Sequence, residues 1–383
     1  MKPPKSSAPA WHLITGEYPP GGGGVGEYTR QLAMSLLAER QQVHVWAPVA
    51  ASSDGGPIVH RVDGFGRAGV RAMGAALDAL PGPRRLLVQY APQAFGMRGM
   101  NVGFCRWVLG RARAGDEVRV MFHEPYVEFS LRHPRRTPIA AANRVMAMLL
   151  LRAARIAYVS TPAWETLLRP WAPASLGPMP WLPIPSTVPR IDDPAAVAAL
   201  RARLGAGDAV RVVGHFGTYG GMIAPLLEPV VRAVLAPPSR SMLLLLGDGG
   251  PAFADHLQRV EPGLRGRIVA PGRQSAEALS IHLQACDVAI QPYPDGVSAR
   301  RTTVMAALAN AVPVATTAGR FTEDAWRASG IPLTPAGDAS ALSAAVLDLL
   351  DDAARRARLG EAGRDFYRAN FAIDRTLTTL LAE

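Results

Sequence analysis

Cysteine is scarce in this 383-residue chain, which excludes a small scaffold held together by disulfides. The two cysteines, Cys105 and Cys286, fall in unrelated segments. They build no metal cluster, so no metal site is expected, and a reducing cytosol suits both thiols.

Long apolar runs are also missing. The longest notable one, Val145–Leu151, is far shorter than the roughly 20 residues that a membrane-spanning helix needs. The start of the chain, Met1–Ala10, is polar and rich in proline, without the apolar segment of a secretory signal. We therefore expect a cytoplasmic protein that is soluble, or attached at most peripherally to the inner face of the cell membrane.

Acidic residues are outnumbered by basic ones, 31 to 41, which gives a formal net charge of +10 and a pI near 10.3. Such a chain is attracted to polyanions: phosphorylated substrates, anionic lipid surfaces or nucleic acid. The basic residues are nearly all arginine and are spread along the chain, without a basic tail or a zinc-finger or RNA-binding signature. A nucleic-acid partner is therefore not expected.

Length and composition predict two domains. The chain is too long for one ordinary core, and a hydrophobic content of 49% with 19% charged residues can fill two. Six prolines between Pro173 and Pro189 form a stiff connector. We place the boundary there, with a first domain over residues 1–185, a second over 186–370, and a C-terminal helix over 371–383 that can cross back to the first domain.

The first half of the chain alternates between strands and helices. An apolar run at Trp11–Thr15 leads through a glycine-rich loop at Gly21–Gly26 into a helix from about Val25, followed by a strand at Val43–Pro48. This pattern is a βαβ unit. No acidic residue closes the second strand, so a nicotinamide or flavin cofactor is not expected. Further strands are expected at Arg85–Tyr90, Glu117–His123 and Ala157–Thr161, and helices at Phe104–Arg113, Ile139–Ile156 and Pro162–Trp171.

The second half repeats this architecture. A strand at Ala209–Phe216 runs into the glycine-rich turn GTYGG and a helix at Ile223–Leu235. Two such openings, one in each half, predict an α/β protein of two Rossmann-like, doubly wound domains that face each other across a cleft. Further helices are expected at Asp192–Leu204, Ala276–Ala285 and Phe366–Leu381, and strands at Ser241–Leu246, at Arg267–Ala270 and in DVAIQPY.

The stretch Ser298–Val314 carries the strongest chemical signal. Arg300 and Arg301 precede an amphipathic helix that starts with Thr302 and Thr303. A helix N-terminus with two guanidinium groups and two hydroxyls can hold a phosphate or diphosphate. The alternative is a surface helix with a solvated basic first turn. Arginine at this end opposes the helix dipole and needs an anion, which favours the phosphate site.

A second candidate site follows the strand Glu117–His123. It consists of His123, Glu124 and Tyr126, at the strand end where open α/β sheets bind ligands. Gln93 lies in the loop after the preceding strand. The alternative for His123 is a structural histidine that hydrogen-bonds a neighbouring loop, and the sequence leaves both hypotheses open.

The segment Arg132–Arg155 contains no acidic residue. The helix expected there carries Arg144 and Arg152 beside a face rich in methionine and leucine. Such a helix is typical of contact with an anionic membrane surface. The alternative is an ordinary helix that covers the sheet, with its arginine stems lying along the surface.

Four motifs resemble those of a known family: GEYPPGGGGVGEYTRQLA, GDGG, GRQSAEALSIHLQACDVAIQPY and MAALANAVPVATTAG. In this order, on both sides of the proline-rich connector, they resemble the retaining glycosyltransferases of family 4, which have the GT-B fold. The resemblance implies a nucleotide-activated sugar as donor, bound in the second domain, and an acceptor bound in the first: a carbohydrate, a lipid-linked molecule or a small molecule. It also implies catalysis without a metal ion or a resident cofactor.

The resemblance and the helix-start argument together assign roles. Arg300 and Arg301 are expected to stabilise the leaving diphosphate, and His123 to position the sugar. The residues expected on the donor side are Gly22, Gly23, Gly24, Gly217, Thr218, Tyr219, Gly247, Gly272, Arg273, Asp295, Ser298, Thr302 and Thr303. Those expected on the acceptor side are Glu17, Tyr18, Gln93, Glu124 and Tyr126.

The sequence departs from the family's pattern of two glutamates separated by seven residues. The matching positions hold Ser298 and Ala306, and the usual arginine and lysine are absent from GHFGTYGG. Arg300 and Arg301 can restore the positive charge, and Asp295 can supply one carboxylate from a shifted position. The missing glutamates leave two further hypotheses open: a non-catalytic GT-B relative that binds a nucleotide sugar or a protein partner, and another sugar-nucleotide enzyme such as an epimerase.

Overall fold

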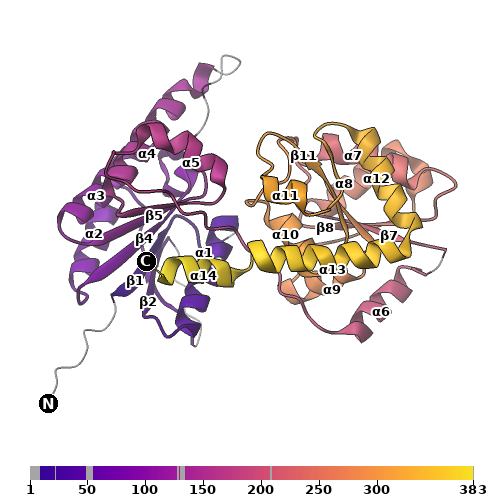
Figure 1. The fold of residues 1–383 in the computed structure, drawn as a ribbon, viewed down its shortest axis with the longest axis horizontal. Helices are drawn as coiled ribbons and strands as arrows, with labels where there is room; N and C mark the ends of the chain where they lie inside the picture. Colours follow the sequence, from indigo (N-terminus) through magenta and orange to yellow (C-terminus); the bar gives the residue numbers. More distant parts are fainter. Residues whose placement is uncertain are drawn as a thin grey trace. The chain divides into compact units, whose positions relative to one another are not determined.

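The computed structural model describes residues 9–21, 23–48, 55–126, 129, 134–207 and 209–382. The chain divides into two compact units, drawn in Figure 1: Met1–Pro183 together with Ile373–Glu383, and Ile184–Ala372. Each unit is built on a six-stranded sheet whose neighbouring strands are parallel.

The sheet of the first unit has the strand order β3-β2-β1-β4-β5-β6. Its strands are β1 (Ala10–Thr15), β2 (Val43–Ala47), β3 (Ile58–Arg61), β4 (Arg84–Tyr90), β5 (Glu117–Phe122) and β6 (Ile156–Val159). Its helices are α1 (Gly24–Ala38), α2 (Arg67–Asp78), α3 (Val102–Arg113), α4 (Thr137–Ala153), α5 (Pro162–Leu168) and α14 (Ile373–Leu381), with short 3₁₀ turns η1 (Pro92–Phe95), η2 (Met97–Gly99), η3 (Pro134–Arg136) and η4 (Arg169–Trp171).

The sheet of the second unit has the order β12-β11-β10-β7-β8-β9. Its strands are β7 (Val212–Phe216), β8 (Met242–Leu246), β9 (Ile268–Gly272), β10 (Val288–Gln291), β11 (Val314–Ala318) and β12 (Leu333–Pro335). Its helices are α6 (Pro194–Arg203), α7 (Ala224–Leu235), α8 (Gly250–Val260), α9 (Ala276–Gln284), α10 (Thr302–Ala309), α11 (Asp324–Ala328), α12 (Ala339–Asp351) and α13 (Ala353–Asn370), with one 3₁₀ turn, η5 (Pro262–Leu264).

Both sheets share one topology. Counted from the first strand of each unit, the order is 3-2-1-4-5-6, that of the doubly wound Rossmann fold, which confirms the predicted α/β fold class. The order reverses between β1 and β4 in the first unit and between β7 and β10 in the second. The loops that leave these strand pairs run to opposite faces, so a crevice is expected at each carboxyl edge.

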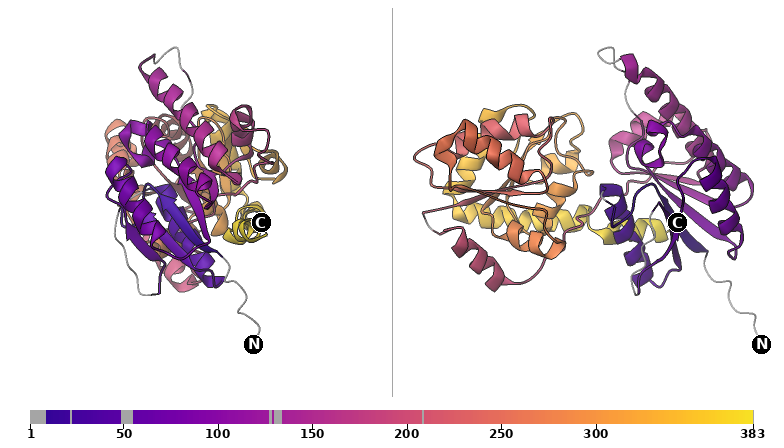
Figure 2. Two further views of the ribbon diagram at one scale, coloured as in Figure 1. Left: turned by 90° about the vertical axis from the view of Figure 1, so that its left-hand side faces the viewer. Right: turned by 180° about the vertical axis from the view of Figure 1, so that it is seen from behind.

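Helices cover both faces of each sheet (Figures 1 and 2). In the first unit α1 lies beside α14, whereas α2, α3 and α4 follow one another over the opposite face. In the second unit α7 packs against α12, and α10 packs against α9 and α13. Right-handed crossovers produce this arrangement, because the connecting helix changes face where the strand order reverses. Strands covered on both sides are apolar throughout, as in Leu243–Leu246.

The segment between β2 and β4 contains β3 and α2, two elements that the sequence analysis did not predict. Helix α2 buries Val70, Met73 and Leu77, which recur at helical spacing, and leaves Arg67 and Arg71 exposed. Glycines within this segment obscured the periodicity. A run of polar and small residues does not exclude a helix whose apolar side is this narrow.

The single helix predicted over Phe366–Leu381 is wrong, because the structure has two helices there. Phe371 leaves helical geometry after α13, is fully buried and stacks on Trp326. The chain then enters α14, which belongs to the first unit. There the carbonyl of Leu380 accepts a hydrogen bond of 3.1 Å from Nη1 of the buried Arg119.

No helix within the described residues is long and apolar enough to cross a membrane.

Candidate functional site

A cavity of about 200 Å³ lies in the second unit where the loops after β7 and β10 diverge. This is the position at which doubly wound folds bind ligands. Three segments line it: the end of β7 with the turn after it, the end of β10, and the start of α10. The lining residues are His215, Phe216, Gly217, Thr218, Met222, Ile223, Gln291, Tyr293, Pro294, Arg300, Arg301, Thr302 and Thr303.

The start of α10 brings two cations to this cavity. Arg300 and Arg301 both form ion pairs with Asp295, which follows β10. This finding corrects the premise that the two arginines need a bound anion, because Asp295 supplies one from within the chain. Each arginine side chain is 21% exposed, so a ligand can reach it.

The loop that carries Asp295 is held closely against the rest of the unit. The N–H of Phe321 donates a 3.2 Å hydrogen bond to the carbonyl of Asp295. Gly296 follows with φ +84°, and a Cβ there would lie 2.1 Å from the nitrogen of Gly319. Only glycine fits this turn, so the position of the Asp295 carboxylate is fixed by backbone packing.

Aromatic rings hold the two guanidinium groups as well. Arg301 lies 4.6 Å from the ring centroid of Tyr293, and Arg300 lies 5.4 Å from that of Phe321. Both distances fall within the range of cation–π attraction. The arginine forks are therefore oriented before any ligand arrives.

A chain of hydrogen bonds crosses the crevice. The hydroxyl of Tyr293 donates to Oε1 of Gln291 at 3.2 Å, and Nε2 of Gln291 donates to the carbonyl of Phe216 at 3.0 Å. Oγ1 of Thr303 lies 2.8 Å from the same Tyr293 hydroxyl and is its donor, since the tyrosine proton is already used. Burial raises the pKa of Tyr293 to about 12, so this proton stays in place at neutral pH. The network ties α10 to the ends of β10 and β7.

His215 presents a neutral imidazole to the cavity. Burial lowers its pKa to about 4. Nδ1 lies 2.8 Å from the carbonyl of Ile290 and must carry the proton of that hydrogen bond. Nε2 is therefore an acceptor, and it faces the Gly217 turn, where a Cβ would lie 3.4 Å away.

Six of the predicted residues line this cavity and the other predicted donor residues of the unit do not. Those that line it are Gly217, Thr218, Arg300, Arg301, Thr302 and Thr303. The lining residues that the sequence analysis missed include His215, Gln291 and Tyr293. Their one signal in the sequence is position, because His215 lies near the end of β7 and the other two at or just after the end of β10.

The remaining predicted donor residues have other surroundings. The Tyr219 hydroxyl donates to the carbonyl of Leu246 at 3.0 Å, and Gly247 packs so closely on the backbone of Gly217 that a Cβ would lie 2.4 Å from its oxygen. Arg273, after Gly272, is largely exposed and lies 3.6 Å from Asp248. Ser298 is fully buried. Asp295 does not line the cavity itself, but it forms ion pairs with two arginines that do.

In the first unit, the glycine-rich loop meets a carboxylate of the chain itself. Oε1 of Glu17 accepts hydrogen bonds from the N–H groups of Val25 (2.9 Å) and Gly26 (3.2 Å) at the start of α1. Gly23 leaves room for it, since a Cβ there would lie 2.2 Å from the carboxylate. Gly24 is exposed, and Gly22 lies outside the described residues. Glu17 therefore occupies the anion position that the loop was expected to offer a phosphate.

His123 is held by structural contacts at the end of β5. Its Nε2 donates to Oε1 of Gln89 at 2.7 Å, its ring meets that of Tyr28 edge-on, and only 7% of the residue is exposed. Burial lowers its pKa to about 3, so it is neutral. Its carbonyl accepts hydrogen bonds from Trp164 (2.9 Å) and Ser160 (3.1 Å).

The other predicted acceptor-side residues are dispersed. Tyr18 is buried, whereas Gln93 and Glu124 are exposed. The hydroxyl of Tyr126 donates to the carbonyl of Leu167 at 2.9 Å, and Arg144 lies over its ring.

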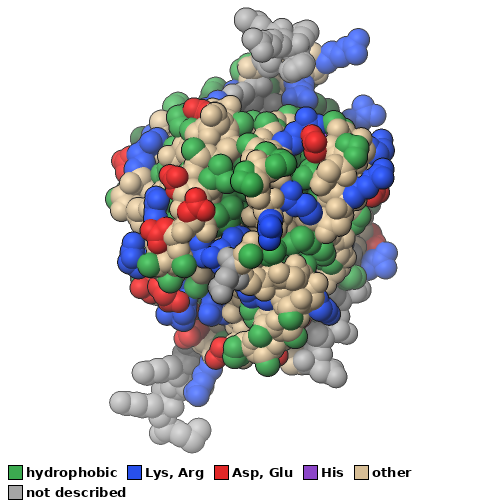
Figure 3. Space-filling view, turned by 90° about the vertical axis from the view of Figure 1, so that its right-hand side faces the viewer, with side chains coloured by type: hydrophobic (Ala, Val, Ile, Leu, Met, Phe, Trp, Pro, Cys, Tyr) green, Lys and Arg blue, Asp and Glu red, His purple; other side chains and the backbone are tan. Residues whose placement is uncertain are grey.

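The basic segment before β6 covers the sheet. Helix α4 buries Met146, Leu150 and Leu151 and packs on α3 and β5, while Arg152 stays exposed. Arg132 lies outside the described residues. Membrane contact through this segment stays a prediction. Figure 3 draws a face of the second unit, where acidic and basic side chains both lie.

The fold and the site together define a class. The chain has the GT-B fold of glycosyltransferases. Sucrose-phosphate synthase from Thermosynechococcus elongatus is 18% identical with a TM-score of 0.70, over 98% of this chain and 100% of that chain. Anabaena HepE in complex with UDP and glucose is 16% identical, with the same TM-score and coverage. An α,α-trehalose-phosphate synthase (UDP-forming) from Burkholderia vietnamiensis is 14% identical with a TM-score of 0.64, over 95% of this chain and 96% of that chain.

The second unit carries the sequence signature of this class. Residues 209–352 match the family model described as Glycosyl transferases group 1, and every residue that lines the cavity falls in this range. No curated protein sequence matches the chain significantly. The predicted GT-B glycosyltransferase resemblance is thereby confirmed.

Proposed function

We propose that the chain transfers a sugar from a nucleoside-diphosphate sugar to an acceptor hydroxyl, with retention of the anomeric configuration and without a metal ion. One observation carries this proposal. Arg300 and Arg301 line the crevice of a glycosyltransferase group 1 domain, oriented by a carboxylate and two aromatic rings. Under the same proposal the first unit binds the acceptor, and the chain works in the cytoplasm.

The two arginines would act on the leaving group. Breaking the bond between sugar and diphosphate moves negative charge onto the phosphate oxygens. Guanidinium groups already in position stabilise that charge with little reorganisation. The hydroxyls of Thr218 and Thr302, which also line the cavity, would add hydrogen bonds to the same oxygens.

The two buried histidines would act as neutral groups. His215 would accept a hydrogen bond at Nε2 from a donor hydroxyl, because its pKa of about 4 keeps it unprotonated. His123 would position the sugar in the same neutral state, with its ring held by Gln89. Neither histidine is suited to act as a general acid near pH 7, since both would have to gain a proton first.

The nature of the donor is supported by the solved structures. Anabaena HepE was solved with UDP and with UDP-glucose, and the Burkholderia synthase is described as UDP-forming. We therefore propose a uridine-diphosphate sugar as the first donor to test. Mixing the chain with UDP-glucose and a panel of acceptors should release UDP, and proton NMR of the product should show the donor's anomeric configuration. EDTA should leave the rate unchanged.

A second candidate is a GT-B relative that binds a nucleotide sugar without transferring it. It is favoured by the absence of acidic residues from the described lining and by Ser298 and Ala306, which are buried and carry no carboxylate. Binding of UDP-glucose with no UDP release, with or without acceptor, would support this candidate over the first. A new sugar nucleotide formed without any acceptor would instead indicate an epimerase.

A further inference from the structure

A larger cavity of about 860 Å³ lies in the first unit, between α2 and α3. The two helices lie side by side over one face of the sheet (Figure 1). The volume falls within the range of about 300–1,000 Å³ that is typical of small-molecule pockets. None of its lining residues belongs to the predicted donor or acceptor set, so it is not part of the site described above.

The floor and walls of this groove are mainly apolar. Phe65, Val70, Met100 and Trp107 line it, and small residues leave the space between the helices open. Gly74 is one of these: a Cβ there would lie 3.2 Å from Nε1 of Trp107, closer than nearly all real contacts. An apolar ligand would displace water from these side chains, which is favourable in proportion to the area covered.

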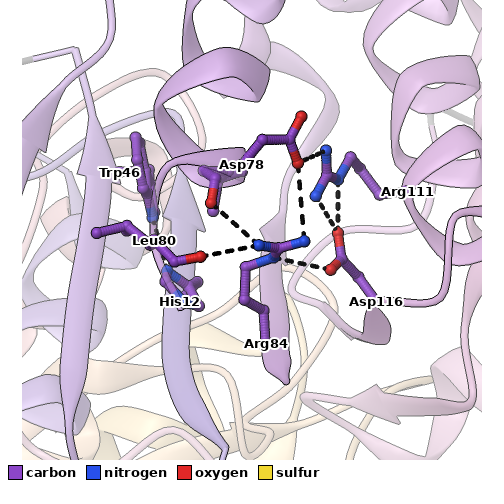
Figure 4. A network of polar contacts seen from close by, with 8 residues as sticks. His12, Trp46, Asp78, Leu80, Arg84, Arg111 and Asp116 are labelled. Carbon is purple, nitrogen blue, oxygen red and sulfur yellow. Dashed lines mark hydrogen bonds and ion pairs between the residues drawn. The ribbon is translucent and has the colours of Figure 1, made fainter. Parts of the chain in front are cut away.

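The two ends of the groove differ in charge. Arg67 and Arg71 lie in the first turns of α2, and neither forms an ion pair within the described part of the chain. Asp78 lies eleven residues after Arg67, which corresponds to about 16 Å along the helix. It is already neutralised by Arg111 at 2.7 Å, with Arg84 at 3.7 Å (Figure 4).

The network at the Asp78 end closes the groove. Arg111 also contacts Asp116, which accepts a 2.9 Å hydrogen bond from Arg84, so two arginines and two aspartates form one connected group (Figure 4). Its charges cancel. The groove therefore has a balanced, fixed end and an open end with two unpaired cations.

At the rim of the open end, the apolar side chain of Met97 is exposed to solvent. Met97 and Arg98 both have positive φ, 52° and 54°, in a turn where such angles are uncommon for residues other than glycine. The Met97 side chain is 64% exposed as a result and lines the groove. Strain of this kind persists at binding sites, where it positions a side chain for a ligand.

We propose that this groove binds a single anionic amphiphile, with its apolar chain along α2 and α3 and its phosphate or carboxylate at Arg67 and Arg71. The match is one of shape and charge: an elongated apolar channel that ends in two cations. The proposal does not depend on sugar transfer, so it stands or falls separately from the proposed function.

The first test compares head groups on one tail. Dodecyl phosphate, below its micelle-forming concentration, is titrated into the full chain by calorimetry. We expect one molecule bound per chain, at least tenfold more tightly than dodecyltrimethylammonium, with a negative heat-capacity change from burial of the tail. Inorganic phosphate alone should not bind there. Equal affinity for the two amphiphiles, or no saturable binding, would overturn the proposal.

The second test locates the tail. Ala75→Phe adds bulk at an exposed position of α2 that lines the groove, and Ala76→Phe adds the same bulk at the next exposed position, which does not. Affinity for dodecyl phosphate should fall at least tenfold in the first variant and stay within twofold in the second. Equal effects in two variants that both fold, judged by circular dichroism, would contradict the assignment.

The third test locates the head and needs no change in the groove's shape. The double variant Arg67→Ala/Arg71→Ala should reduce the preference for the phosphate head to less than threefold. Arg106→Ala/Arg113→Ala, on the exposed side of α3 outside the groove, should preserve it. If Ala75→Phe does not fold, these two double variants test the proposal on their own.

Other occupants of the groove give distinct results. Sedimentation with phosphatidylglycerol-containing vesicles, without binding of monomeric dodecyl phosphate, would mean that the groove meets a membrane surface and not a single molecule. A dimer by light scattering that Ala75→Phe converts to monomer would assign the groove to a second copy of the chain. Either outcome overturns the proposal.

Discussion

The ends of β1 and β7 occupy equivalent places in two sheets of the same topology, yet the chain treats them differently. After β1, Gly16 packs so closely on Ala94 that a Cβ would lie 2.1 Å from its carbonyl oxygen, and Glu17 caps α1. After β7, the Gly217 turn leaves a cavity of about 200 Å³ lined by arginines and hydroxyls. Identical topology provides the crevice, and local side chains decide whether it is filled by the chain or left for a ligand.

The helix starts at the two places also differ in how their charge is balanced. At α1, the Glu17 carboxylate accepts two backbone N–H groups directly. At α10, the carboxylate of Asp295 pairs with two guanidinium groups that line the crevice. The second unit therefore presents arginine side chains at its crevice, whereas the first unit places a carboxylate at the equivalent helix start, and this difference is what the following measurements test.

The largest expected effect is on turnover. Arg300→Ala and Arg301→Ala should each lower kcat by about one to three powers of ten, because each removes a charge contact to the leaving diphosphate. Steady-state UDP release measures this. Arg320→Ala, a nearby arginine that does not line the cavity, is the matched control. Wild-type turnover from both variants would contradict the assigned role.

The next largest effect is on stability in acid. The pKa of His123 is about 3 when folded and near 6.5 when unfolded, so the unfolded chain gains a proton first as pH falls. Above pH 6.5, His123 is neutral in both states and does not affect how the free energy of unfolding depends on pH. Below pH 6.5, the free energy of unfolding falls by about 1.4 kcal/mol per pH unit, because the unfolded chain binds one more proton. Urea unfolding at several pH values from 7 to 5 gives the free energy of unfolding at each pH. This free energy should fall less steeply with decreasing pH in His123→Gln than in wild type. The same pH dependence in His123→Gln and wild type would contradict this role of His123.

A smaller effect is expected at Asp295. Asp295→Asn keeps the size of the side chain but removes the charge that offsets Arg300 and Arg301, together with one of the two oxygens that accept from them. UDP should then bind several-fold to about tenfold more tightly at low salt, with the gain reduced by added salt. Calorimetric titration of UDP measures it. Weaker binding would mean that Asp295 serves mainly to orient the arginines.

The smallest effect concerns the first unit's helix cap. Glu17→Ala removes the acceptor for two N–H groups of α1 and should lower the free energy of unfolding by about 1 kcal/mol. Glu27→Ala, in the first turn of the same helix but without a cap hydrogen bond, is the control. An equal loss in both variants would show that the cap itself contributes nothing.

The fold was predictable because its signals are local. Apolar runs such as Trp11–Thr15 and Ser241–Leu246, each followed by glycines and an amphipathic helix, indicate parallel strands with crossovers. The break at Phe371 was not predictable, because helical periodicity continues across it. What ends α13 is the stacking of Phe371 on Trp326, more than forty residues earlier in the chain.

The sequence predicted several residues of the candidate site, but not the contacts that these residues make. The helix start at Arg300–Thr303 was found from residue type and position alone. Its pairing with Asp295 depends on the tight turn at Gly296, which brings the carboxylate back toward α10. His215 and Tyr293 were missed because an isolated histidine or tyrosine near a strand end has no distinguishing spacing.

The return of α14 to the first unit has a consequence for biosynthesis. Arg119 is fully buried, and one of its hydrogen bonds goes to Leu380, which the ribosome adds only after the whole second unit. A nascent chain that has folded the first sheet still lacks this partner while about 190 further residues are made, which takes on the order of 10–40 s. During that interval, the face that α14 will cover is open to chaperones.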